Sequence, residues 1–255
     1  MLCLGAVPAA IAAGPDKSAV PARLTAACRL PNGGGAGGWA ADGLRLSARD
    51  NRKANDFLVG ACRAERSISP QVAAAARLSQ AQLVGFQNRL KSPDSLKRKI
   101  ATRMQDRGTT AEAELARLTD AVRYTLQWND RQYTGGVTIA SAVLAGWGNT
   151  SNEWKNSWAF PADKGYPRVV NSSWKAPAAG QLFEIQFHTR AGKQANLKGH
   201  VLYEEERLPR TSPERKAELH QQQAALYAKV PVPAGAPQLA APPAQPSPEL
   251  LAATG

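Results

Sequence analysis

One alternating segment, residues 183–189, constrains the fold of this chain more than any other. It reads FEIQFHT, so three apolar side chains alternate with the polar side chains of Glu184, Gln186 and His188. In an extended strand, a period of two puts the apolar set on one face and the polar set on the other. The segment therefore predicts a strand with one face on a core. The polar face is either an ordinary solvated surface or part of a binding site.

The rest of the chain predicts helices before and between further strands. Apolar residues at helical spacing predict helices over residues 44–66, 70–90, 93–108, 110–118, 138–147, 191–206 and 213–229. Strands are expected over residues 121–128, 153–160, 168–175 and 181–189, with a hairpin at Ala178–Gly180 between the last two. A sheet with helices packed on it is an α/β or α+β architecture.

Composition divides the chain into one domain and its flanking segments. Its 255 residues, 43% of them hydrophobic, suffice for one domain with a sizeable core, expected over residues 43–230. Residues 1–14 are apolar, rich in small residues and end near an A-x-A site, which predicts a signal peptide. Residues 15–42, rich in Gly, Ala and Pro, predict a flexible arm. Residues 231–255, with Pro among Ala and Gln, predict a disordered tail.

The signal peptide predicts a secreted, extracellular protein, and the cysteines fit that prediction. Cleavage would remove Cys3 and leave Cys28 and Cys62, which suggests one disulfide in an exported chain. Lipid attachment at Cys28 and two free buried cysteines remain the alternatives. No segment is apolar for long enough to span a bilayer, so no membrane partner is expected.

The net charge of +12 implies an anionic partner. Nucleotides, nucleic acid, a phospholipid surface and acidic wall polymers are all eligible on charge alone, and a charge that only aids solubility is the alternative. Choosing among these partners requires a motif.

Three segments supply that motif. Residues 89–99 read RLKSPDSLKRK, Asp120 and Arg123 follow, and EIQFHT begins at Glu184. In this order they resemble the synthetase domain of the RelA/SpoT family, whose donor motif is R-x-K-[ST]-P-[ED]-S-[IL]-x-x-K and whose catalytic strand is E-I-Q-x-[RH]-T. The resemblance covers about residues 85–208 and is strongest to the secreted actinobacterial ATP nucleotide 3′-pyrophosphokinases. It implies a nucleotidyltransferase-like fold, a mixed sheet flanked by helices with a helical N-terminal part, and transfer of pyrophosphate from ATP to a nucleotide 3′-hydroxyl.

For the ATP donor, the resemblance implies a set of cations. Arg89 would stack on the adenine, as a planar guanidinium can. Lys91 and Lys99 would neutralise phosphates, and Ser95 would donate a hydrogen bond to one. Ser95 and Lys99 are four residues apart, hence on one face of a helix. Arg123 is also expected at ATP, although it follows Asp120 by three residues where the family has five. An ordinary basic amphipathic helix is the alternative.

The resemblance assigns catalysis and metal binding to Asp120 and Glu184. Carboxylate oxygens suit Mg²⁺, which binds through one or two carboxylates together with substrate phosphates. Glu184 has a second implied role as the base that takes the 3′-hydroxyl proton. Neighbouring cations and a metal are expected to lower its pKa, which favours ligation first. A lone aspartate before a strand is otherwise a cap or turn residue.

For the acceptor nucleotide, the resemblance implies Tyr166, Asn171, Gln186 and His188. Tyr166 would stack on the base, although Asn171 follows it by five residues where the family has four. Gln186 would hydrogen-bond the ribose. The eligible acceptors are purine nucleotides: GTP, GDP, GMP, ATP, ADP and AMP. Tyr166 as a loop aromatic that covers the core is the alternative.

Two other functions remain open. An interbacterial toxin could use the same chemistry, and a basic module for nucleic acid or wall polymer could keep the fold without catalysis. The presence of both Asp120 and Glu184 disfavours the binding module. We therefore expect a monomeric enzyme without a stable nucleic-acid partner.

Overall fold

The computed structural model describes residues 37–161, 164–206, 208 and 210–243. The helices are α1 (Ala48–Leu78), α2 (Pro93–Arg107), α3 (Ala111–Ala116), α4 (Asp130–Gly146), α5 (Arg190–Glu206) and α6 (Pro213–Ala228). The strands are β1 (Trp39–Ala41), β2 (Leu44–Leu46), β3 (Gln82–Val84), β4 (Arg123–Trp128), β5 (Thr150–Asn156), β6 (Val170–Lys175) and β7 (Leu182–Thr189). Short 3-10 turns are η4 (Phe86–Asn88), η5 (Ser157–Ala159) and η7 (Ala236–Gln238).

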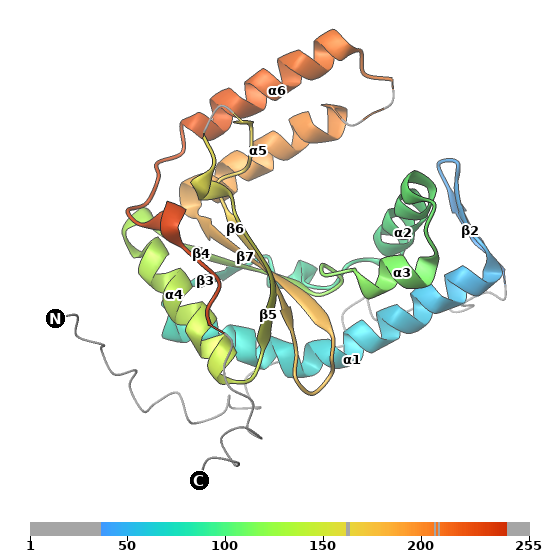
Figure 1. Cartoon of the computed structure of the whole chain (residues 1–255), viewed down its shortest axis with the longest axis horizontal. Helices are drawn as coiled ribbons and strands as arrows, with labels where there is room; N and C mark the ends of the chain where they lie inside the picture. The colour runs from blue at the N-terminus through green and yellow to red at the C-terminus, as the bar shows by residue number, and fades with distance from the viewer. Residues whose placement is uncertain (1–36, 162–163, 207, 209, 244–255) are drawn as a thin grey trace.

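The core of the fold is a five-stranded sheet in the order β3-β4-β7-β6-β5 (Figure 1). β4 and β7 are parallel, and the other neighbouring strands are antiparallel. The predicted hairpin between β6 and β7 is confirmed; Gly180 in its turn has a φ of 62°, a conformation that favours glycine. The predicted mixed α/β class is therefore confirmed.

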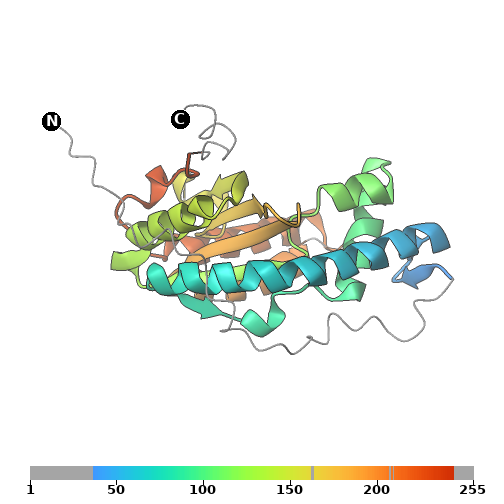
Figure 2. The same cartoon turned by 90° about the horizontal axis from the view of Figure 1, so that it is seen from below.

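The two faces of the sheet are covered differently, as the alternation in β7 predicts. Phe183, Ile185 and Phe187 are fully buried. They share the face on which α1 and α4 pack, where the Tyr133 hydroxyl of α4 donates to the Phe187 carbonyl at 2.9 Å. On the opposite face α5 crosses β7 and β4, and α6 packs on α5 (Figures 1 and 2). The polar side chains of β7 therefore lie between the sheet and the α5–α6 pair.

The N-terminal half differs from the predicted pair of helices. α1 is a single helix that continues through Pro70, because Ile68 and Val72 on either side of the proline are buried in the core and tertiary packing offsets the lost backbone bond. Residues 44–46 pair with residues 39–41 as a hairpin, whose Asp42–Gly43 turn has positive φ at both residues. Residues 82–84 form an edge strand instead of helix.

The predicted disordered tail is wrong for residues 231–243. Ala236 is fully buried, and three side chains donate to backbone carbonyls of this segment. Thr134 Oγ1 donates to Ala234 at 2.7 Å, Trp154 Nε1 to Leu239 at 3.1 Å, and Asn156 Nδ2 to Ala236 at 2.8 Å. A proline-rich segment can be held in this way because its carbonyls still accept hydrogen bonds.

Several predictions fall on residues that the structure leaves undescribed. The signal peptide at residues 1–14, most of the arm at residues 15–42 and residues 244–255 of the tail lie outside the described residues. So does Cys28; Cys62 lies on α1 against the core, and their pairing stays a prediction. Among the described residues, no helix is both long and apolar enough to cross a membrane.

Candidate active site

Asp120 is the residue at which the first predicted group of site residues converges. Its Oδ2 accepts hydrogen bonds from Lys91 Nζ at 3.0 Å and from Lys99 Nζ at 2.8 Å. Lys99 comes from α2, whereas Lys91 precedes α2 in an extended segment whose backbone N–H donates to the Ala121 carbonyl at 2.9 Å. Backbone pairing beside β4 therefore brings Lys91, Lys99 and Asp120 together.

The electrostatic state of Asp120 follows from burial and these two lysines. The residue is only 8% exposed. Burial opposes ionisation, but Lys91 and Lys99 outweigh it and lower the pKa of Asp120 to about 2. The second carboxylate oxygen, Oδ1, is buried and has no hydrogen-bond partner in the described part of the chain. Asp120 is thus ionised at neutral pH, and its Oδ1 is available to a ligand.

Glu184 lies beside this group on β7. Its backbone N–H donates to the Val122 carbonyl at 2.9 Å, and in the parallel register it stands opposite Arg123. Gln186 Nε2 donates to Glu184 Oε1 at 2.6 Å. Burial raises the pKa of Glu184, and Asp120 adds to the rise against Arg123 and Lys99. Without a metal, burial therefore outweighs the nearby cations; the predicted lowering, which includes a bound metal, stays a prediction.

Arg89 is held by contacts within the fold. Its side chain is 7% exposed, and its Nε donates to Glu65 Oε1 of α1 at 2.5 Å. Its guanidinium also covers the Phe86 ring, 4.2 Å from the centroid. In this structure a buried carboxylate and an aromatic ring already occupy the guanidinium, and stacking of Arg89 on a donor base stays a prediction. Arg89 joins α1 to the start of the donor segment.

Ser95 begins the donor helix where the sequence predicted. Ser92 caps α2, accepting from the Ser95 backbone N–H at 3.2 Å, and Pro93 occupies the first turn. The Ser92 hydroxyl donates to Ser95 Oγ at 2.8 Å, which leaves the Ser95 proton directed to solvent or a ligand. Ser95 is exposed and lies one turn from Lys99. The cap thus positions the serine that the motif assigns to a phosphate.

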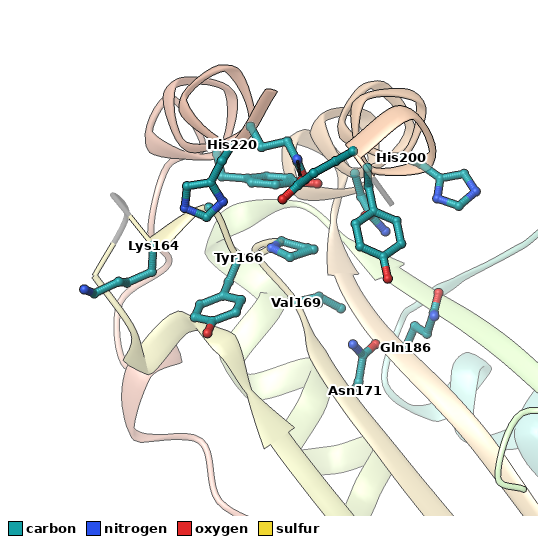
Figure 3. Close-up of a pocket in the computed structure, with 14 residues that line it drawn as sticks. Lys164, Tyr166, Val169, Asn171, Gln186, His200 and His220 are labelled. Atoms are coloured by element: carbon teal, nitrogen blue, oxygen red, sulfur yellow. Dashed lines mark hydrogen bonds between the residues drawn. The ribbon is translucent and has the colours of Figure 1, made fainter. Parts of the chain in front are cut away.

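A cavity of about 390 Å³ contains most of the predicted acceptor residues. Tyr166, Asn171 and Gln186 line it from the loop before β6, from β6 and from β7, and α5 and α6 form its other side (Figure 3). Asn171 and Gln186 are direct partners across the β6–β7 pair. Tyr166 is half exposed and packs against Phe160 at a ring-centroid distance of 5.3 Å. The aromatic ring and the two amides can together hold a base and a sugar.

His188 is the predicted acceptor residue that does not line this cavity. It lies at the end of β7, fully buried, and neither ring nitrogen has a hydrogen-bond partner within the described ranges. Burial, with help from Lys193, lowers its pKa to about 3, so the imidazole is neutral at ordinary pH. In this structure α5 follows β7 directly and covers this end of the strand, and the contact of His188 with an acceptor nucleotide stays a prediction.

A second cavity, of about 250 Å³, lies between β4, β7 and the first turns of α5. Arg123 and Lys193 line it with Gln186, which also lines the first cavity. Arg123 therefore lies near Glu184 and away from the lysines on Asp120. Sequence reasoning did not single out Lys193; the only available signal was its position one turn after the matched strand, at the start of the next helix.

Asp120 and Glu184 fit a magnesium ion in part. The orphaned Oδ1 of Asp120 and the neighbouring Glu184 carboxylate supply hard oxygen donors. No group of three or more His, Cys, Asp or Glu side chains that could hold a metal occurs among the described residues. Two carboxylates are too few for a closed protein site, but they suffice for Mg²⁺ that is completed by phosphate oxygens and water.

Comparisons with known proteins find similar structures only. No protein-family model matches the chain, and no curated protein matches it. Solved structures that resemble it are alarmone synthetases and a GTP pyrophosphokinase family protein. Small alarmone synthetase 1 from Bacillus subtilis is 16% identical over 69% of this chain and 91% of its own, with a TM-score of 0.49. The same synthetase bound to its product pppGpp is 15% identical over 69% and 92%, with a TM-score of 0.49. The Streptococcus pneumoniae family protein is 17% identical over 69% and 88%, with a TM-score of 0.45.

Proposed function

We propose that this protein is a secreted ATP:nucleotide 3′-pyrophosphokinase of the RelA/SpoT type. The observation that carries the proposal is the convergence of Lys91, Lys99 and Asp120 beside Glu184. These residues come from three separate segments: two match motifs of that family, and the Asp120 segment resembles a third with a shorter spacing to its arginine. A basic binding module would need the cations but would have no use for a buried carboxylate and a partly buried one at their centre.

The reaction is an in-line transfer of a diphosphoryl group. The acceptor 3′-oxygen forms a bond to the β-phosphorus of ATP, and the bond from that phosphorus to the oxygen bridging the α-phosphorus breaks. AMP leaves with the bridging oxygen. The 3′-hydroxyl proton passes to the Glu184 carboxylate, which is linked to the acceptor cavity through its contact with Gln186. Gln186, which donates to Oε1, holds that carboxylate in place.

The donor is held by charge. In the free protein the ammonium groups of Lys91 and Lys99 both donate to Asp120 Oδ2. When ATP binds, its phosphate oxygens give each ammonium group a second anionic partner. Ser95, on the same face of α2 as Lys99, supplies a neutral donor to one phosphate. Mg²⁺, held by Asp120 and Glu184, would supply further neutralisation of the polyphosphate. The lysines are thus kept at the site by the aspartate before ATP arrives.

The acceptor is a purine nucleotide in the first cavity. Its base would stack on Tyr166, and its ribose would lie against Asn171 and Gln186. Gln186 lines both cavities and donates to Glu184. A ribose beside Gln186 therefore presents its 3′-hydroxyl to the Glu184 carboxylate, the proton acceptor. The product is the corresponding nucleotide 3′-diphosphate.

Chromatography of the reaction products tests the proposal. Purified protein lacking residues 1–14, incubated with Mg²⁺, ATP and either GTP or AMP, should release AMP and form a 3′-pyrophosphorylated nucleotide. Asp120→Asn and Glu184→Gln should each lower product formation by about a hundredfold or more. Glu153→Gln is the matched control, because Glu153 is an exposed carboxylate on β5 of the same sheet. Intact ATP, or ADP with free phosphate, would contradict the assignment.

A further inference from the structure

The second cavity contains two cations near Glu184 that form no ion pair with a described residue. Arg123 comes from β4 and Lys193 from the first turn of α5. Neither side chain forms a salt bridge or a side-chain hydrogen bond with any residue that the structure describes. By contrast, Lys91 and Lys99 both form salt bridges with Asp120. No acidic residue lines the cavity.

Lys193 is held there against three electrostatic costs. It is partly buried, it faces the like charge of Arg123, and it stands at the helix end where the macrodipole disfavours a cation. Burial and Arg123 accordingly lower its pKa, and only the carboxylate of Glu184 opposes them. Two close cations over polar strands, with Thr125 and Gln186 beneath them, are an arrangement that a bound anion would stabilise.

The position of the cavity relates this anion to the chemistry. Glu184 lies between the two groups of cations, since it interacts with Lys99 on one side and with Arg123 on the other. Gln186 lines this cavity and the acceptor cavity as well. An anion on Arg123 and Lys193 would therefore lie next to the carboxylate that takes the 3′-hydroxyl proton. A cavity of about 250 Å³ has room for a diphosphate.

We propose that Arg123 and Lys193 form a diphosphate subsite that binds the β- and γ-phosphates of the donor during transfer, with Lys193 as a catalytic residue. The proposal rests on the proposed function, which it deepens by dividing the donor between two groups of cations. Lys91 and Lys99 bind the part of the polyphosphate nearest Asp120. Arg123 and Lys193 bind the diphosphate that is transferred to the acceptor.

Calorimetric titration with inorganic pyrophosphate tests the subsite without any turnover. The protein without residues 1–14 should bind pyrophosphate, and Lys193→Gln should weaken binding by about tenfold or more, the size of one lost charge-assisted hydrogen bond. Lys193→Arg should retain most of the affinity. Lys198→Gln is the matched control, because Lys198 is an exposed lysine of the same helix outside the cavity, and it should bind as the parent does.

Thermal melting separates loss of the site from loss of the fold. Because Lys193 is partly buried next to a like charge, Lys193→Gln should melt at the same temperature or higher. Pyrophosphate binding that is equal in Lys193→Gln and in the parent, or absent from the parent, would overturn the subsite.

Kinetics with two acceptors identify whose phosphates the subsite holds. If Lys193 binds the donor diphosphate, Lys193→Gln should reduce kcat/KM by the same factor with GMP and with GTP. A loss that grows with the number of acceptor 5′-phosphates would place Lys193 at the acceptor and overturn the proposal. The two proposals also fail separately. Normal product formation by Lys193→Gln would refute the subsite and leave the pyrophosphokinase, whereas Lys193-dependent pyrophosphate binding without product would refute the pyrophosphokinase and leave the anion site.

Discussion

Replacing Glu65 by alanine would test the structural role that the fold gives to Arg89. Both side chains are almost fully buried, 7% exposed for Arg89 and 8% for Glu65, and their charges meet at 2.5 Å. Ser69 Oγ donates to Glu65 and lies 2.8 Å from the Tyr124 hydroxyl, so the carboxylate is part of a closed network. Removing it leaves a guanidinium buried without a counter-charge. That loss is expected to cost about 3–5 kcal/mol of unfolding free energy.

Denaturant unfolding of Glu65→Ala, Arg89→Ala and the double variant measures this cost. For a domain of this size, a loss of this magnitude lowers the melting temperature by about 6–20 °C. Each single variant leaves one charge buried alone, whereas the double variant leaves none. The double variant should therefore be less destabilised than the sum of the single variants by about 2 kcal/mol or more. Tyr124→Phe, which removes only a hydroxyl of the network, should cost about 1 kcal/mol.

The same variants decide between structure and substrate binding at Arg89. If the ion pair is structural, Arg89→Ala should lose stability, and the KM for ATP of its folded fraction should stay near that of the parent. An Arg89→Ala variant with unchanged unfolding free energy and a strongly raised KM for ATP would refute this reasoning. Arg89 would then be the stacking residue that the motif suggested.

Four further expectations concern the site and the flanking segments. Asp120→Asn should lower the free energy of unfolding by about 2 kcal/mol at pH 7, because the pKa of Asp120 is lower in the folded chain than in the unfolded one. Paired denaturant curves should show the full difference between parent and variant above about pH 4 and about half of it at pH 3. Glu184→Gln should lower turnover by about a hundredfold or more with an unchanged melting temperature, and near-normal turnover would show that Glu184 takes no part in the reaction. In the parent alone, kcat/KM should fall with decreasing pH at a pH above the usual pKa range of a glutamate. A chain that ends at Pro231 should melt earlier than one that ends at Pro243, and equal melting would show that the 231–243 contacts are unimportant. Mass spectrometry of the exported protein should find Cys28 linked to Cys62, and quantitative alkylation without reductant would exclude the bond.

Local patterns predicted the elements that carry the site. The alternation in residues 183–189 correctly separates the buried Phe183, Ile185 and Phe187 from the polar face. The Ser92–Pro93 pair correctly begins α2, because a capping hydroxyl and a proline in the first turn are local backbone chemistry. The mixed α/β class followed from the order of such elements. These features depend on neighbours within a few residues, so one sequence suffices to predict them.

Other features depended on contacts between distant segments. Pro70 would end an isolated helix, yet α1 continues because both sides of the proline are buried. The 231–243 segment has a disordered composition, yet donors from α4 and β5 hold its carbonyls. Neither the partners nor their distances can be read from the segment itself.

The sequence by itself determined which residues are available for chemistry, since the motifs that contain Lys91, Lys99, Asp120 and Glu184 can be read without a fold. Only the tertiary structure decided what each residue faces. It buried Arg89 and His188, and it raised the pKa of Glu184 where neighbouring cations alone would have lowered it. It also added Lys193 by laying α5 over β7. Burial and charge proximity arise from the packing of segments far apart in the chain, so they exist only once the chain has folded.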